Sequence, residues 1–160
     1  MLWLSSEAWR QLDISAPVDG IAYVGVGNPS LRRRYREEWR PRNSGRSSPR
    51  RTLGAVLAHD LRLVPRPRSD RDPKRGAHYY TFGEEGEARL TRWLEEHASF
   101  ACRATEDLIA EDVETQLIQL VTPPLNLTKW GNPLKQRMRE ARKAMEVRAA
   151  EFQRGLLSEG

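Results

Sequence analysis

Three features of this 160-residue chain have side chains that could act on a phosphate group: Tyr23, the arginines at 32–34, and Glu114. Tyr23 lies in the apolar run Ile21–Val26, between Gly20 and Gly27. Its hydroxyl could donate a hydrogen bond to a phosphate, or accept a proton with help from nearby cations. Unaided, a phenol with a pKa of about 10 is a poor base at neutral pH. The alternative is that Tyr23 has only a structural role, as a strand residue with one face packed against the rest of the protein.

The stretch that follows this run is the most basic in the chain. Residues 31–51 contain nine Arg and two Glu, within a chain of 27 Lys+Arg and 22 Asp+Glu and a net charge of +5. The planar fork of Arg matches two phosphate oxygens at once, and a fixed Arg stabilises the transition state of phosphoryl transfer. Three consecutive helical positions cover too wide an arc to face one ligand. The alternative to phosphate binding is that these arginines form a solvated basic face. The candidate phosphate ligands in this stretch are Arg33, Arg50 and Arg51.

Glu114 lies on the apolar flank of a predicted helix, where it shares a face with Ile118 and Val121. Carboxylates seldom occupy such a position without a partner. An Arg partner would make Glu114 structural, whereas a hard cation such as Mg²⁺, which often takes one or two carboxylates, would make it a metal ligand. Glu111, one turn earlier, is the nearest rival. The helix itself is expected to bury Ile109, Val113, Leu117 and Leu120.

The elements that must position these residues alternate between short strands and helices, which is typical of a small α/β or α+β domain with a modest sheet. Strands are predicted at Ile21–Val26, at 78–82 and at Phe100–Arg103. A long exposed loop is predicted at Pro65–Ala77. The predicted helices are 6–12 capped by Ser5 or Ser6, 29–39, 49–61 capped by Ser48, Glu85–His97, Glu106–Val121 and Pro133–Leu157.

Composition narrows the class of protein. The lone Cys102 excludes an internal disulfide and is expected to be a buried thiol. No run approaches the roughly 18 apolar residues that a membrane span needs, and the N-terminus has no basic region followed by a long apolar run. We therefore expect a soluble, cytoplasmic protein with no signal peptide. The arginine excess favours nucleic acid as its partner.

The motifs, taken together, resemble those of the GIY-YIG nuclease family. Tyr23-Val24-Gly25 is similar to its YIG element, Leu31 followed by Arg34 to its helix arginine, and VETQLIQLVTPPLNL to its late helix. In that last segment Glu114, an apolar pair, a proline and Asn126 stand at the spacing of the family. The resemblance covers roughly residues 20–126.

The resemblance implies a nuclease with a three-stranded sheet flanked by helices and one Mg²⁺ or Mn²⁺ ion. It assigns the metal to Glu114, the scissile phosphate to Arg34, and placement of the attacking water to Tyr23. Asn126 is a further candidate phosphate ligand. The metal would neutralise charge on the phosphate and the leaving oxygen.

The expected organisation has three parts. Residues 1–19 form an extension or a degenerate first strand, residues 20–130 a GIY-YIG-like nuclease domain, and residues 131–160 a basic helix that could pair two copies of the chain. The first tyrosine motif of the family is not visible upstream of Tyr23. MLWL or AWRQL would have to supply that strand, with Trp in place of Tyr, and Glu38 stands where relatives often carry His.

The leading interpretation is a metal-dependent DNA endonuclease in a restriction, repair, mobile-element or phage-defence setting. The second is a nucleic-acid-binding module derived from a nuclease, with weak or lost catalysis, because the departures fall on proton-transfer groups. A third is a scaffold protein whose arginines and last helix bind an acidic protein partner. His78, with Tyr79 and Tyr80, could reach the active site from the strand predicted there.

Overall fold

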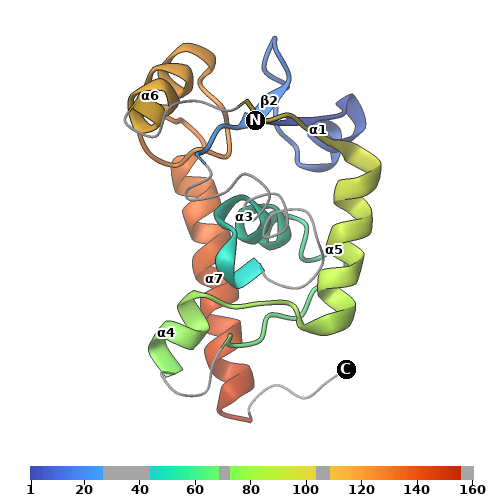
Figure 1. The fold of residues 1–160 in the computed structure, drawn as a ribbon. Coiled ribbons are helices and arrows are strands. Elements are labelled where there is room, and N and C mark those ends of the chain that lie inside the picture. Colours follow the sequence, from blue (N-terminus) through green and yellow to red (C-terminus); the bar gives the residue numbers. More distant parts are fainter. Residues whose placement is uncertain (27–43, 69–72, 104–108, 156–160) are drawn as a thin grey trace.

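The computed structural model describes residues 1–26, 44–68, 73–103 and 109–155. Figure 1 shows the arrangement of the elements in these ranges. Three strands, six α-helices and one 3₁₀ helix are described. They are β1 (Leu2–Leu4), α1 (Ser6–Gln11), β2 (Ile21–Tyr23), η1 (Ser44–Arg46), α3 (Ser48–Val56), α4 (Pro73–His78), α5 (Gly83–His97), β3 (Ala98–Phe100), α6 (Ala110–Val121) and α7 (Lys135–Gln153).

The three strands form one antiparallel sheet in the order β2-β1-β3, which confirms the predicted α/β class and the number of strands. The N-terminal MLWL segment supplies the central strand, whereas AWRQL lies mostly in α1. Leu2 pairs with Tyr23 but Trp3 pairs with Ile21, so β2 contains one extra residue. Such a bulge re-aims the neighbouring side chains. It places Tyr23 on the face that packs against the main core.

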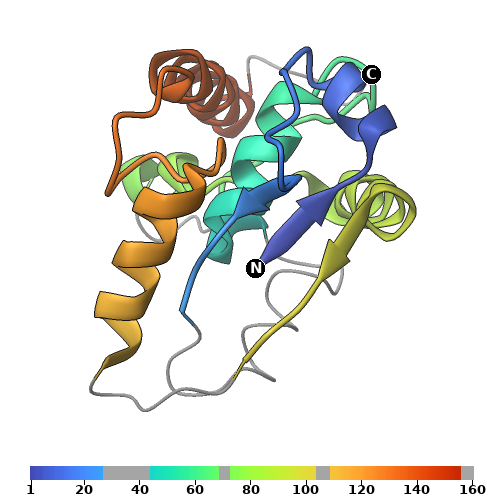
Figure 2. The same ribbon diagram turned by 90° about the horizontal axis from the view of Figure 1, so that it is seen from above.

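Two apolar clusters cover the two faces of the sheet. The main core joins Leu2 and Leu4 to buried side chains of α3, α5 and α7, with Tyr23 packed against it. The smaller cluster joins Ile21 and Val24 to Ile118 of α6, and Trp3 packs against it. Figure 2 shows α6 beside β2, at the edge of the sheet opposite β3.

Residues from all three expected segments enter the main core. Leu2 and Leu4 come from residues 1–19, and Met138, Met145 and Ala149 come from α7. Helix α7 runs along α3 and α4, and its apolar side is buried within its own chain. That side is therefore not available to pair α7 with a second copy.

The ends of several predicted elements shift by a few residues. Ser5 caps α1, accepting a hydrogen bond from the Ala8 N–H at 3.2 Å. Ser47, not Ser48, caps α3. Helix α5 begins at Gly83, two residues before the predicted start, and β3 begins at Ala98. The predicted helix 29–39 lies outside the described residues.

Two segment predictions are wrong. The predicted exposed loop 65–77 contains the start of α4, and the predicted strand 78–82 is reduced to one bridge between Thr81 and Arg66. Tyr80 and Phe82 are nevertheless buried, so the apolar residues that suggested a strand pack into the core from an irregular segment.

Two burial predictions are also wrong. Helix α6 buries only Ile118 among its described side chains, while Ile109 is 46% and Leu120 77% exposed. The physical reason is its place beside the edge strand, where only one narrow side meets the sheet. Cys102 is exposed. No helix in the described ranges is both long and apolar enough to cross a membrane.

Candidate active site

A hollow of about 600 Å³ opens between the end of β2, α6, the segment after α6, and α7. Tyr23 and Glu114, which lie 91 positions apart in the sequence, both line it. Arg33 and Arg34, and the Glu38 position, fall outside the described residues. The structure thus brings together two of the three predicted catalytic side chains.

Tyr23 lies over Gly25, the third residue of the YVG element. A Cβ atom at Gly25 would be 2.7 Å from Cε1 of the Tyr23 ring and 2.9 Å from its hydroxyl oxygen. Any larger residue at position 25 would therefore push the ring aside. The glycine is needed because the tyrosine ring occupies the space of its missing side chain.

Asn126 joins the segment after α6 to β2. Its Oδ1 accepts a hydrogen bond from the Val24 N–H at 2.8 Å, and its Nδ2 donates to the Val24 carbonyl oxygen at 2.8 Å. The adjacent Leu125 N–H donates to the Ala22 carbonyl oxygen at 2.9 Å. The side-chain amide thus acts like one more peptide unit at the edge of the sheet. Asn126 is 7% exposed, and its amide is engaged by the strand rather than presented to a ligand.

This attachment brings α6 close to the end of β2 and positions Glu114. The Val26 N–H donates a hydrogen bond to Glu114 Oε1 at 3.1 Å. The ammonium of Lys129 forms an ion pair with Oε2. The Glu114 side chain is 13% exposed and that of Lys129 is 33% exposed. The rival Glu111 is exposed one turn earlier and does not line the hollow.

The surroundings of Glu114 suit a hard divalent cation. One carboxylate oxygen already holds a cationic group at the wall of the hollow, and Mg²⁺ or Mn²⁺ can bind through one carboxylate while keeping its waters. No group of three or more His, Cys, Asp and Glu side chains gathers within the described part of the chain. In that part, Glu114 and Glu146 are the carboxylates that line the hollow, and Glu114 is the one beside the end of β2.

Helix α7 forms a cationic wall of the same hollow through Arg139, Arg142 and Lys143. These side chains, with Glu146, recur three and four positions apart, which places them on one face of the helix. The sequence predicted a basic helix at residues 131–160, but not that its cations line the site. The i, i+3, i+4 spacing, together with the apolar side at Met138 and Met145, is the signal that could have found them.

The far end of this wall holds a small polar cluster. Glu146 Oε2 lies 3.4 Å from Nδ1 of His78, and Lys143 donates to Glu146 Oε1 at 3.1 Å. Burial raises the pKa of Glu146, but the hydrogen bonds and the charges of Lys143 and His78 together lower it by more, so its pKa lies below the ordinary value of 4.5. His78 and Tyr80 line the hollow, although from the end of α4 and the residues after it, not from a strand.

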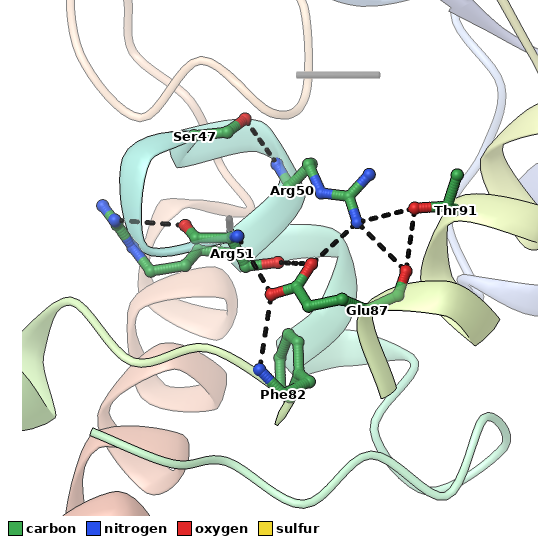
Figure 3. Close-up of polar contacts among 7 residues, drawn as sticks. Ser47, Arg50, Arg51, Phe82, Glu87 and Thr91 are labelled. Atoms are coloured by element: carbon green, nitrogen blue, oxygen red, sulfur yellow. Dashed lines mark hydrogen bonds and ion pairs between the residues drawn. The ribbon is translucent and has the colours of Figure 1, made fainter. Parts of the chain in front are cut away.

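Arg50 lies inside the protein and is not placed to bind a phosphate there. Its side chain is 1% exposed, and Nη2 donates to Glu87 Oε2 at 2.8 Å and to Thr91 Oγ1 at 3.0 Å. Glu87 also accepts from the Ser44 N–H and hydroxyl, each at 3.0 Å, and from the Phe82 N–H at 3.3 Å. Figure 3 shows this closed network. The prediction from the sequence was wrong because residue type alone does not show whether an arginine will be buried or exposed.

Arg51 leaves α3 in the opposite direction from Arg50 (Figure 3) and is also buried. Its Nη1 donates to the Gly45 carbonyl oxygen at 2.9 Å, and its guanidinium carbon lies 5.0 Å from the centre of the Tyr79 ring. Burial, followed by the charge of Arg142, lowers the pKa of Arg51 from its ordinary value to about 10, so it stays charged at neutral pH. Arg51 therefore supports η1 and α3 and does not line the hollow.

Comparison with known proteins identifies a matching family. A family model described as the GIY-YIG catalytic domain matches residues 11–149. No curated protein and no solved structure matches. The matched span includes Tyr23, Glu114, Asn126 and most of α7, and it begins after β1. It crosses both of the domain boundaries expected from the sequence.

Proposed function

The chain belongs to the GIY-YIG family of nuclease-type catalytic domains, and from that membership we propose that it is a metal-dependent endonuclease that hydrolyses phosphodiester bonds in DNA. The observation that carries the proposal is the hollow itself. It has Tyr23 and Glu114 on one side and the cations of α7 on another. We place the activity in a cytoplasmic restriction, repair, mobile-element or phage-defence setting.

The residues take different roles in this proposal. Glu114 holds one Mg²⁺ or Mn²⁺, which supplies positive charge to the scissile phosphate and the leaving oxygen. Tyr23, fixed over Gly25, orients the attacking water through its hydroxyl. Arg34, and Arg33 beside it, contact the phosphate that is cut. Arg139, Arg142 and Lys143 bind phosphates that flank it.

Three residues expected to bind phosphate receive positioning roles instead. Arg50 and Arg51 hold η1 and α3 in place, through Glu87 and Gly45 respectively. Asn126 holds the segment after α6 against β2, so that Glu114 stays beside the end of that strand. All three act through other groups and would not touch the substrate.

A binding module with weak catalysis is the second candidate function, and Trp3 favours it. The central strand β1 exists, but Trp3 packs with the cluster around Ile118, while Tyr23 packs on the other face of the sheet. An indole offers a donor N–H and no titratable proton acceptor. The strand that carries a tyrosine in relatives therefore brings no general base to Tyr23 here.

A cleavage assay separates these functions. Supercoiled and single-stranded DNA are incubated with Mg²⁺ or Mn²⁺ and with wild type, Glu114→Gln and Glu111→Gln. Glu111→Gln is the matched control, because it makes the same change at an exposed glutamate of the same helix. We expect cleavage by wild type and Glu111→Gln, and a loss of at least about a hundredfold in Glu114→Gln. Cleavage that survives in Glu114→Gln would remove the metal-ligand assignment.

Salt dependence of DNA binding tests the role of the α7 wall. Each neutralised phosphate adds about 0.9 to the slope of log affinity against log salt. Replacing Arg139, Arg142 and Lys143 together by Ala should therefore lower that slope by about 2 to 3. Binding without cleavage under either metal would support the second candidate. Negligible DNA affinity at physiological salt would contradict both and favour a protein partner.

A further inference from the structure

The cation that pairs with Glu114 is a side chain of the same protein, Lys129. Lys129 lies in the loop between α6 and α7, and its ammonium pairs with Glu114 Oε2. The other oxygen, Oε1, accepts the Val26 N–H at 3.1 Å. Both oxygens of the proposed metal ligand are thus engaged, one by the backbone and one by a cationic side chain.

The loop around Lys129 is held on both sides. The Asn126 carbonyl oxygen accepts hydrogen bonds from Trp130 Nε1 at 2.9 Å and from Asn132 Nδ2 at 2.9 Å. Asn132 Nδ2 also donates to the Pro124 carbonyl oxygen at 2.8 Å. Lys129 itself has φ 72°, a left-handed conformation that residues other than glycine adopt seldom. These contacts fix the loop at the position from which the Lys129 side chain reaches Glu114.

The two contacts of Glu114 differ in how easily they can be exchanged. The Val26 N–H belongs to the backbone next to β2 and stays with the fold. Lys129 carries its ammonium on a flexible stem, is one-third exposed, and can rotate into the hollow without moving the backbone. Oε2 is therefore the oxygen that can change its partner.

We propose that Lys129 is the resident cation of Glu114 and exchanges with the divalent cation, so that metal binding at Glu114 releases the Lys129 ammonium into the hollow. The inference rests on the proposed function, because it takes Glu114 as the metal ligand. Without the metal, Lys129 neutralises a carboxylate that would otherwise face the incoming phosphates. Once released, it adds a fourth cation to Arg139, Arg142 and Lys143.

The first test is Mn²⁺ binding to the free protein, measured by calorimetry or by the EPR signal of unbound Mn²⁺. In Lys129→Met the competing ammonium is gone, and we expect Mn²⁺ to bind about tenfold more tightly. Lys129→Arg keeps a cation and should bind as weakly as wild type. Lys143→Met is the matched control: it removes the same charge from the same hollow, but this lysine pairs with Glu146.

The second test follows the amine directly. Labelling by an amine-reactive reagent, quantified by mass spectrometry, should become faster at Lys129 when Mn²⁺ is added to wild type. Lys143 should label at an unchanged rate. In Glu114→Gln, Lys129 should already label fast and should not respond to Mn²⁺.

The outcomes separate this inference from the proposed function. In one outcome, Mn²⁺ binding depends on Glu114, but Lys129→Met gains no more Mn²⁺ affinity than Lys143→Met and the labelling rate of Lys129 does not respond to Mn²⁺. This outcome overturns the exchange but leaves the metal site intact. Mn²⁺ binding that does not depend on Glu114 overturns both. A tighter Lys129→Met together with metal-dependent labelling of Lys129 confirms the exchange.

Discussion

Glu87 and Glu114 perform similar local tasks in two different environments. Glu114 accepts the N–H of Val26, just before residues 27–43, and Glu87 accepts the N–H of Ser44, just after them. Each carboxylate also pairs with a cation. The Arg50–Glu87 pair is 1% and 3% exposed, whereas the Lys129–Glu114 pair is 33% and 13% exposed. Accessibility, not residue type, therefore separates a structural carboxylate from one that can take a ligand.

The number of partners reinforces this difference. Glu87 accepts from Ser44, Phe82 and Arg50, so its lone pairs are used inside the protein. A buried ion pair of this kind is stable only when its remaining hydrogen-bonding groups are satisfied. Glu114 has one backbone donor and one exchangeable cation. The Glu87 carboxylate is enclosed by protein groups, whereas the Glu114 carboxylate faces the hollow.

Removing the closed carboxylate should give the largest effect. Glu87→Ala leaves the buried Arg50 guanidinium without its carboxylate and removes the acceptor for the Ser44 and Phe82 N–H groups. We expect the free energy of unfolding to fall by about 3–5 kcal/mol. Urea denaturation measures it. Glu95→Ala, at an exposed position of the same helix, is the control and should change stability by less than about 0.5 kcal/mol.

A double variant shows how much of that loss in stability comes from leaving Arg50 charged and unpaired with Glu87. Arg50→Met combined with Glu87→Leu removes both charges, so it should recover part of the stability. Recovery should be incomplete, because Ser44 and Phe82 still lack an acceptor. A Glu87→Ala variant as stable as wild type would show that the buried network does not stabilise the fold.

The next effect concerns the attachment that positions the open carboxylate. Asn126→Ala removes the hydrogen bonds to the N–H and the carbonyl of Val24 and leaves both groups without these partners. We expect a loss of about 2–3 kcal/mol, measured by urea denaturation. Asn126→Asp keeps an acceptor for the Val24 N–H, but its ionised carboxylate would place a second oxygen against the Val24 carbonyl oxygen at a buried position, so it should be no more stable than Asn126→Ala. Equal stability of all three proteins would contradict the attachment.

Much of the fold could be predicted because it depends on local patterns. The serine cap of α1, the amphipathic α5 and the apolar run of β2 follow from residue spacing. The bulge at Ala22 and the burial of Tyr80 from an irregular segment could not be predicted, because they depend on contacts between distant parts of the chain.

The candidate site was predictable where a motif fixes a residue and not where the fold decides burial. Tyr23 and Glu114 were predicted and do line one hollow. Arg50 and Arg51 were predicted as phosphate ligands, yet the packing of α3 against α5 and η1 buries them. The wall formed by Arg139, Arg142 and Lys143 was missed, because their spacing groups them on one side of α7 but only the folded structure shows that this side faces the hollow.

The same substitution at both carboxylates tests the comparison directly. Glu114→Gln keeps an oxygen for the Val26 N–H and loses only a partly exposed ion pair, so its stability should fall by less than about 1 kcal/mol. Glu87→Gln should cost more, since it leaves Arg50 charged and buried. Thermal unfolding of the two variants in parallel measures the difference. Equal losses would show that the Glu114 site is as closed as that of Glu87.

The smallest effect should come from Glu146, a third carboxylate, which lies beside His78 and Lys143 along the same hollow. Its pKa in the folded chain lies below 4.5, so the ionised form is favoured by folding. That contribution is fully present above the unfolded pKa and is lost as the pH falls through the lower folded pKa. Glu146→Gln should therefore lower stability slightly at neutral pH and flatten the decline of stability below about pH 4.5.

Thermal midpoints from about pH 7 to about pH 3 test this, with Glu140→Gln on the same helix as the control. A decline as steep as that of wild type would show that the contacts with His78 and Lys143 do not favour the ionised carboxylate, and that only Glu87 and Glu114 of the three are tied to the fold by charge.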